Sequence, residues 1–161
     1  MKKLGLFLML AAVVSLSSCD KEEETMFVDG DYKAETAEYS HGWITFLEVT
    51  ISGDVLTVVN WDARQEDGSL KSNATAETYP MDPHPTVWIS QLEAKIKATD
   101  ITTFDLHSVI DGIDAAVADE TENVDGVTGA THASHSGYEL LDLILEAAKD
   151  GDTTTQILSA K

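Results

Sequence analysis

The chain has 161 residues, of which 29 are acidic and 10 are lysine or arginine, so its formal net charge is −19. A surface this acidic repels nucleic acid and anionic lipid headgroups, and we expect neither as a partner. The one cysteine, Cys19, leaves no pair for a disulfide and no set of thiolates for a metal. The length suits one domain with one core.

The N-terminal segment has the layout of an export signal. Two lysines precede an apolar run from Leu4 to Val14, which is too short to span a membrane. Leu16-Ser17-Ser18-Cys19 then resembles a bacterial lipobox, which implies that Cys19 is lipidated, as by palmitate. We predict a signal peptide at 1–18 and a lipidated cysteine with an acidic tether at 19–28. An ordinary signal with a stray cysteine is the alternative. The protein is then lipid-anchored in the cell envelope and extracytoplasmic, with the membrane and its face left open.

The next segments have the composition of strands. Gly30 to Tyr39 partly alternates, and Ile44 to Ile51 is rich in β-branched and aromatic residues. Ser52-Gly53-Asp54 predicts a hairpin turn, with Val55 to Trp61 as the return strand. Within the middle strand, the side chains expected to face the core are those of Ile44, Phe46, Val49 and Ile51.

The second half of the chain has helical spacing. Three prolines between Tyr79 and Pro85 predict a loop, and the apolar spacing from Thr86 to Ala98 predicts a helix. Phe104 to Ala118 is expected to be helical at first and irregular past Asp111-Gly112.

The last helix has signals at both ends. Ser136 and Glu139 have the spacing of a capping box, and Gly151 is a C-terminal stop. Strands followed by helices predict an α+β fold, with an antiparallel sheet and helices packed on one face. We place this single domain at residues 29–153, with a C-terminal tail at 154–161.

The stretch before this helix, Val124 to Gly137, combines hydroxyls with little side-chain bulk. The free N–H groups and the dipole of a helix N-terminus favour a phosphate, and Thr131 lies a few residues before the predicted start. Gly129 and Ala130 allow close approach of a ligand, while hydroxyls supply further donors at Thr128, Ser134 and Ser136. The stretch lacks the lysine of a P-loop. It also lacks the strand followed by GxGxxG that is typical of a dinucleotide-binding site.

Asp125-Gly126-Val127-Thr128-Gly129-Ala130-Thr131 resembles the flavinylation motif of the FMN-binding domain family, which includes covalent-flavin subunits of the Rnf and sodium-pumping NADH:quinone oxidoreductase complexes. The resemblance implies that a flavin transferase moves FMN from FAD onto Thr131 through a phosphodiester. Asp29–Ala34, Ser40–Trp43, Asp67–Ser72 and Lys149–Thr153 further resemble small surface flavin lipoproteins of extracellular electron transfer. Together with the hydroxyl donors and an aromatic side chain that could stack on the ring, the candidate cofactor-binding residues are Thr131, Asp125, Gly126, Thr128, Gly129, Ala130, Ser134 and Trp43.

Several of these roles have alternatives. Asp125 either helps the transferase to place its metal ion or caps a turn, and Trp43 either stacks on the flavin or packs at a strand start. Trp61 and Trp88 are expected in the core. His132 and His135 are spaced to share a helix face, but no clustered carboxylate accompanies them, so we expect no metal site.

The expected function is that of a membrane-anchored electron carrier with covalent FMN, and not of a turnover enzyme. Its partners would be the flavin transferase, a membrane quinone-linked or other redox donor, and an external electron acceptor. One alternative is a non-redox lipoprotein binding module of the cell envelope. Another is an independent enzyme such as a flavin reductase, but no general-acid/base pair or nucleophile–histidine–carboxylate set stands out.

Overall fold

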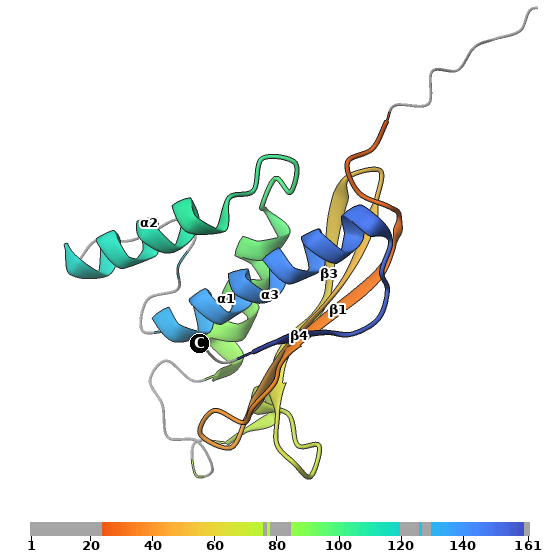
Figure 1. Cartoon of the computed structure of the whole chain (residues 1–161). Helices are drawn as coiled ribbons and strands as arrows, with labels where there is room; N and C mark the ends of the chain where they lie inside the picture. Colours follow the sequence, from red (N-terminus) through yellow and green to blue (C-terminus); the bar gives the residue numbers. More distant parts are fainter. Residues whose placement is uncertain (1–23, 76, 78–84, 120–125, 127–129, 160–161) are drawn as a thin grey trace, which may run out of the picture.

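Four strands form one sheet in the order β3-β2-β1-β4, and the helices pack on one face of it (Figure 1). The computed structural model describes residues 24–75, 77, 85–119, 126 and 130–159. The elements are β1 Gly30–Thr36, β2 Ile44–Ser52, β3 Val55–Arg64, the short 3-10 helix η1 Lys71–Asn73, α1 Pro85–Lys97, α2 Leu106–Ala118, α3 Thr131–Asp150 and β4 Gln156–Leu158. The predicted α+β single-domain fold is therefore confirmed.

β2 and β3 form the predicted hairpin. Gly53 and Asp54 both have positive φ, 56° and 58°, as a two-residue type I′ turn requires. The register shifts beyond Glu48, so that Val59 on β3 has no partner opposite. This bulge lies in β3, and side chains along β2 alternate without interruption.

The predicted inward face of β2 is wrong at two positions. Leu47, Val49 and Ile51 lie in the core, which excludes Ile44 and Phe46 from the same face because strand side chains alternate. Phe46 is buried on the opposite face, where Lys33 and Arg64 lie 5.3 and 5.4 Å from its ring centroid. The same alternation turns Trp43 and Thr45 toward the helices.

α3 begins earlier than the sequence predicts. Its first residue is Thr131 and its N-cap is Ala130, so the capping box of Ser136 and Glu139 is wrong. No glycine or proline interrupts the chain between Ala130 and Ser136, and the helix extends upstream over these residues. The C-terminal end is as predicted, since Gly151 adopts a left-handed conformation with φ 69°.

α1 confirms its prediction within one residue at each end. The expected break at Asp111-Gly112 is wrong, because α2 runs unbroken to Ala118. Asp105 caps α2 by accepting a hydrogen bond from the Ser108 N–H at 2.8 Å. Burial of Ile113 outweighs the cost of about 1 kcal/mol of a helical glycine.

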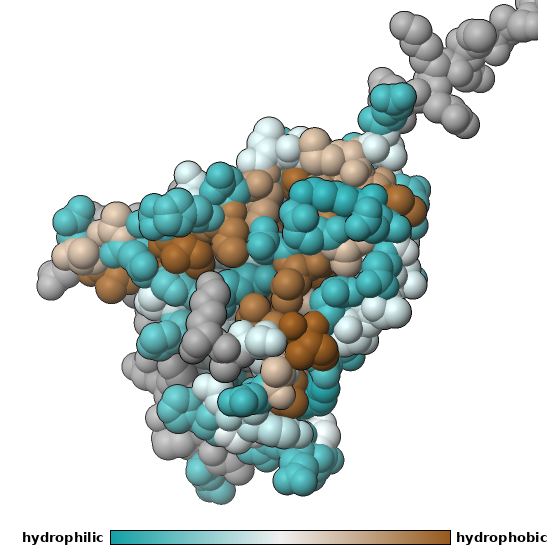
Figure 2. All heavy atoms as spheres, in the orientation of Figure 1, coloured by the Kyte–Doolittle hydropathy of each residue, from teal (hydrophilic) through white to brown (hydrophobic). Residues whose placement is uncertain are grey.

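The helices differ in how closely they contact the sheet. α1 packs against β3, α3 packs against β1 and β2, and α2 packs on α3. Figure 2 shows hydrophilic side chains over much of one face, with hydrophobic ones along α2. Within the described ranges, no helix has both the length and the apolar character needed to cross a bilayer.

Both ends of the domain join the sheet. β4, which falls in the predicted tail, pairs parallel with β1, so the sheet is mixed at this edge. At the other terminus, Met26 N and Phe27 N donate to the Asp54 carboxylate at 2.9 and 3.0 Å. Val28 N donates to Ala148 O at 2.9 Å, which fixes the base of the predicted tether beside the C-terminal end of α3.

Candidate functional site

Trp43 reaches the helix side of the sheet from a tight turn. Ser40 and Trp43 exchange two backbone hydrogen bonds of 2.8 and 3.0 Å. Between them, His41 and Gly42 have φ values of 51° and 84°, the left-handed pair of a type I′ turn. Trp43 is 7% exposed, so the turn directs its indole inward.

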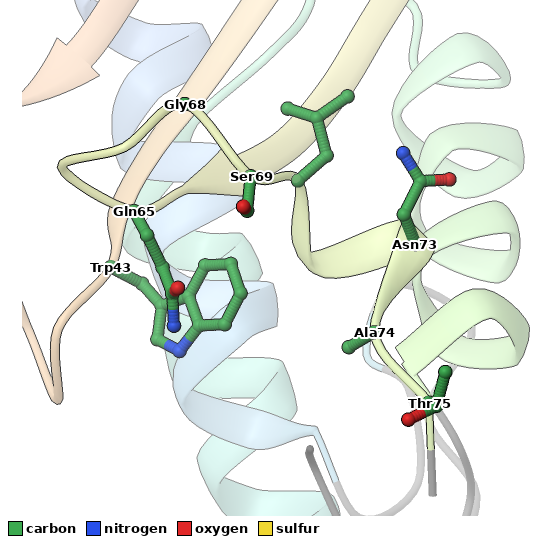
Figure 3. A pocket seen from close by; sticks show the side chains of 8 residues that line it. Trp43, Gln65, Gly68, Ser69, Asn73, Ala74 and Thr75 are labelled. Carbon is green, nitrogen blue, oxygen red and sulfur yellow. The ribbon is translucent and has the colours of Figure 1, made fainter. Parts of the chain in front are cut away.

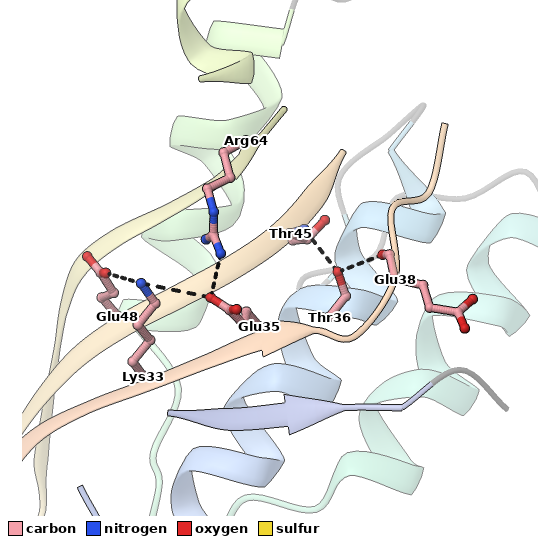
Figure 4. Close-up of polar contacts among 7 residues, drawn as sticks. All are labelled: Lys33, Glu35, Thr36, Glu38, Thr45, Glu48 and Arg64. Atoms are coloured by element: carbon pink, nitrogen blue, oxygen red, sulfur yellow. Dashed lines mark hydrogen bonds and ion pairs between the residues drawn. The ribbon is translucent and has the colours of Figure 1, made fainter. Parts of the chain in front are cut away.

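The base of the same loop is tied to the sheet by Thr36. Its Oγ accepts a hydrogen bond from Thr45 N at 3.1 Å and donates to Glu38 O at 3.3 Å (Figure 4). On the outer face nearby, Glu35 accepts from Arg64 at 2.8 Å and Lys33 pairs with Glu48 at 3.0 Å. These contacts fix the end of the sheet where β1 stops and β2 starts.

A buried carboxylate holds the turn that carries Lys71. Asp62 is 2% exposed, and its oxygens accept from Ser72 N at 3.1 Å and Ser72 Oγ at 2.5 Å. Because Ser72 belongs to η1, these bonds fix the backbone beside Lys71. Lys71 Nζ then lies 5.2 Å from the Trp43 ring centroid and 5.6 Å from that of Trp88.

Burial lowers the pKa of the Lys71 ammonium, and the charge of Asp62 offsets part of that effect. Both tryptophan rings lie within the 6 Å over which a ring face attracts a cation. The result is a partly buried positive charge between two indoles.

The N-terminus of α3 faces the region around Trp43, Lys71 and Trp88. Ala130 makes no side-chain cap, and the first turn of this 20-residue helix has no acidic residue. The N–H groups and the dipole of the helix therefore offer positive character at Thr131, which is half-buried.

These elements enclose one cavity of about 630 Å³, a volume within the usual range of small-molecule sites. All three tryptophans of the chain line it, Trp61 and Trp88 meeting edge to face at 5.5 Å. The described lining residues are Thr36, Ser40, His41, Trp43, Thr45, Trp61, Ala63, Lys71, Trp88, Ala130, Thr131, His132, Ala133, His135, Ser136 and Glu139.

Trp43 also borders a second hollow of about 500 Å³, and its indole forms part of the wall of each (Figure 3). In Figure 3 Gln65 lies against this indole, with Ser69 and Asn73 across the opening. A third hollow of about 390 Å³ shares Thr36, Ser40 and Glu139 with the main cavity. Of these three hollows, the main cavity is the one that has Thr131 among its described lining residues.

The structure brings three of the predicted site residues together. Trp43, Ala130 and Thr131 line the cavity, whereas Gly126 is not among its described lining residues. Ser134 is fully buried, and its Oγ donates to Ala130 O at 3.0 Å inside α3, away from the cavity. The remaining predicted residues, Asp125, Thr128, Gly129 and Cys19, lie outside the described residues.

Sequence reasoning missed Lys71 and assigned Trp61 and Trp88 to the core alone. The two tryptophans are indeed buried, at 1% and 3% exposed, and they line the cavity as well. Their Nε1 atoms are buried with no hydrogen-bond partner among the described residues. Lys71 follows the Asp67-Gly68 turn, and its neighbours in the sequence gave no signal that its side chain lines a cavity.

The histidines of α3 do not assemble a metal site in the described part of the chain, where no group of three or more ligating side chains occurs. His135 Nε2 instead lies 3.0 Å from Asp114 Oδ1 of α2.

No protein-family model matches this chain, and no curated protein matches it. Its fold is similar to the crystal structure of the CPE2226 protein from Clostridium perfringens, with a TM-score of 0.61 and 22% sequence identity. The similarity covers 84% of this chain and 100% of the other. At this identity the likeness supports the fold and nothing about activity.

Proposed function

We propose that this protein is an electron carrier that holds FMN covalently on the hydroxyl of Thr131. The observation that carries the proposal is the shared cavity of Thr131 and all three tryptophans. The motif around Thr131 suggests the attachment point, and the cavity supplies a volume and an aromatic lining that suit a flavin ring.

The chain's own groups match the parts of such a cofactor. The uncapped N-terminus of α3 is suited to the phosphate, because its free N–H groups and its dipole stabilise negative charge. The indoles of Trp43, Trp61 and Trp88 offer apolar surface that excludes water from a planar ring. The buried Trp61 and Trp88 Nε1 atoms are donors whose partners the described residues do not supply. When bound, FMN supplies the reversible uptake of one or two electrons.

A covalent link suits a protein of this charge. A net charge of −19 opposes the binding of a free anionic cofactor from dilute solution. Attachment through Thr131 keeps the local concentration high, so that occupancy does not depend on free FMN.

We place the carrier on the extracytoplasmic side of a membrane, anchored through lipid at Cys19. The lipobox-like segment supports this placement. A membrane redox donor, an external acceptor and the flavin transferase are the partners that this arrangement requires.

The test is in-gel flavin fluorescence after denaturing electrophoresis of the full chain co-expressed with an exported flavin transferase. Wild type should give a fluorescent band, and Thr131→Val, which removes only the hydroxyl, should be dark. Thr57→Val, an exposed β3 position with the same chemical change, should stay fluorescent. A dark wild type beside a second acceptor that the same transferase labels would reject the carrier and favour a non-redox binding module.

A further inference from the structure

The described lining of the cavity is less acidic than the protein as a whole. Acidic residues outnumber lysines and arginines by 29 to 10 along the chain, yet the one described carboxylate in the lining, Glu139, is matched by the cation of Lys71. No other lysine or arginine appears among the described lining residues.

Lys71 is held in place by surrounding structure. Asp62 fixes η1 through Ser72, and the ring centroids of Trp43 and Trp88 lie 5.2 and 5.6 Å from Lys71 Nζ. A long, exposed lysine side chain would sample many rotamers, and these contacts restrict Lys71 to a few.

The location is also unfavourable for the charge of an ammonium. Burial lowers the pKa of Lys71, which means that this environment disfavours the charged form. A charge kept where its solvation is reduced, inside a cavity, is a frequent property of functional sites.

We infer that Lys71 is the residue that sets the electrostatic potential at the ring end of the cofactor cavity, favouring a bound ring in its more electron-rich, reduced state. The inference rests on the proposed function. It assigns the phosphate to the N-terminus of α3 and the ring to the region between Lys71 and the tryptophans. A positive charge near the ring stabilises added electrons, and a site with little water screens that effect weakly.

The first experiment needs no attached cofactor. Thr131→Val protein is titrated with riboflavin, which lacks the phosphate, and with FMN, while tryptophan fluorescence is followed. The signal comes from the cavity because all three tryptophans line it. Lys71→Met should weaken the binding of the dithionite-reduced form of both ligands about tenfold more than that of the oxidised form, because only the reduced ring carries the added electrons that Lys71 stabilises. Lys71→Arg should restore most of that affinity, and Lys97→Met, the same change at an exposed position on α1, should leave it unchanged.

The second experiment measures the midpoint potential of the attached cofactor against a reference dye. At a fixed ambient potential, Lys71→Met should lower the ratio of reduced to oxidised cofactor about tenfold, which is about 30 mV for a two-electron couple. Lys71→Arg should remain near wild type. Glu139→Gln, which removes the opposing charge, should shift the ratio the other way.

The outcomes distinguish failure of the proposed FMN attachment from failure of the role assigned to Lys71. A dark wild-type band rejects the proposed function, whereas the riboflavin titration still tests Lys71. Loss of FMN binding with riboflavin binding intact would place Lys71 at the phosphate and overturn its assignment to the ring. Equal potentials and equal riboflavin binding in wild type and Lys71→Met would overturn the role altogether. Thermal unfolding of each variant shows that it is folded, and Lys71→Gln replaces Lys71→Met where the latter is not.

Discussion

Asp62 is the residue on which the position of Lys71 depends. It is nearly fully buried, and both of its oxygens accept hydrogen bonds from Ser72. The carboxylate also accepts from Ala63 N at 2.7 Å, and a buried acceptor that serves three donors is costly to replace, because the donors left behind lose their partners.

Asp62→Asn should therefore lower the free energy of unfolding by about 1–3 kcal/mol, since an amide can present an N–H group to donors that need an acceptor. Asp67→Asn is the matched control. The Asp67 carboxylate accepts from Ser69 N in an exposed turn, and its loss should change stability by less than about 0.5 kcal/mol. Urea unfolding of both variants measures the difference. Equal costs would show that the Asp62–Ser72 bonds do not hold η1.

The key residues were predictable to different degrees. Thr131 and Trp43 carried local signals, a motif and a turn, and both line the cavity. Lys71 carried none, because its surroundings are formed by the buried carboxylate of Asp62 and by the indoles of Trp43 and Trp88, which come from other elements. Ser134 was predicted as a ligand from its hydroxyl alone, but an earlier helix start places that hydroxyl against Ala130 O.

Among the elements, α1 and α3 pack on each other beside Trp61, which lines the cavity. Gly137 on α3 is buried at this crossing. A Cβ added there would lie 3.0 Å from Leu92 Cδ2, 3.3 Å from Ile96 Cδ1 and 3.3 Å from Trp61 Nε1. The absence of a side chain lets α3 approach α1 and the tryptophan closely.

Gly137→Val should destabilise the protein by about 1–3 kcal/mol, because the added methyl groups have no room in a packed core. Gly137→Ala should lower the free energy of unfolding by less than Gly137→Val. It adds a single methyl group, and a gain of about 1 kcal/mol in helix propensity offsets the close contacts of that group. Thermal unfolding gives the ranking, and near-ultraviolet circular dichroism reports on the displaced indole of Trp61. A Gly137→Val protein as stable as wild type would show that the crossing has room to spare.

The sequence predicted helices and strands correctly where a strong local pattern agreed with the packing. The hairpin of β2 and β3 had both turn chemistry and β-branched strands, and α1 had clear apolar spacing. The start of α3 and the continuity of α2 were missed because local signals at Ser136 and Gly112 pointed to boundaries. α3 extends upstream over residues that include no glycine or proline, and α2 continues past Gly112, where Ile113 and Ala116 are buried.

For the whole molecule, the fold separates the proposed anchor from the proposed cofactor. The chain enters the domain where Val28 N bonds Ala148 O, near one end of α3, and Thr131 begins the other end. About 25 Å of helix lies between Thr131 and Ala148. Figure 1 shows this arrangement, with the N-terminal end of the described chain and the start of α3 at opposite ends of the domain. A carrier built this way presents its cavity at the end of the domain remote from the tether.

Mass spectrometry of the full chain co-expressed with the transferase tests for the bond between Thr131 and FMN. We expect an intact mass raised by one FMN less one water, and a proteolytic map that places the added mass on the peptide containing Thr131. Thr131→Val should show no added mass. An unmodified wild type in cells where the transferase labels another acceptor, or a flavin mapped to a different residue, would show that Thr131 does not carry FMN.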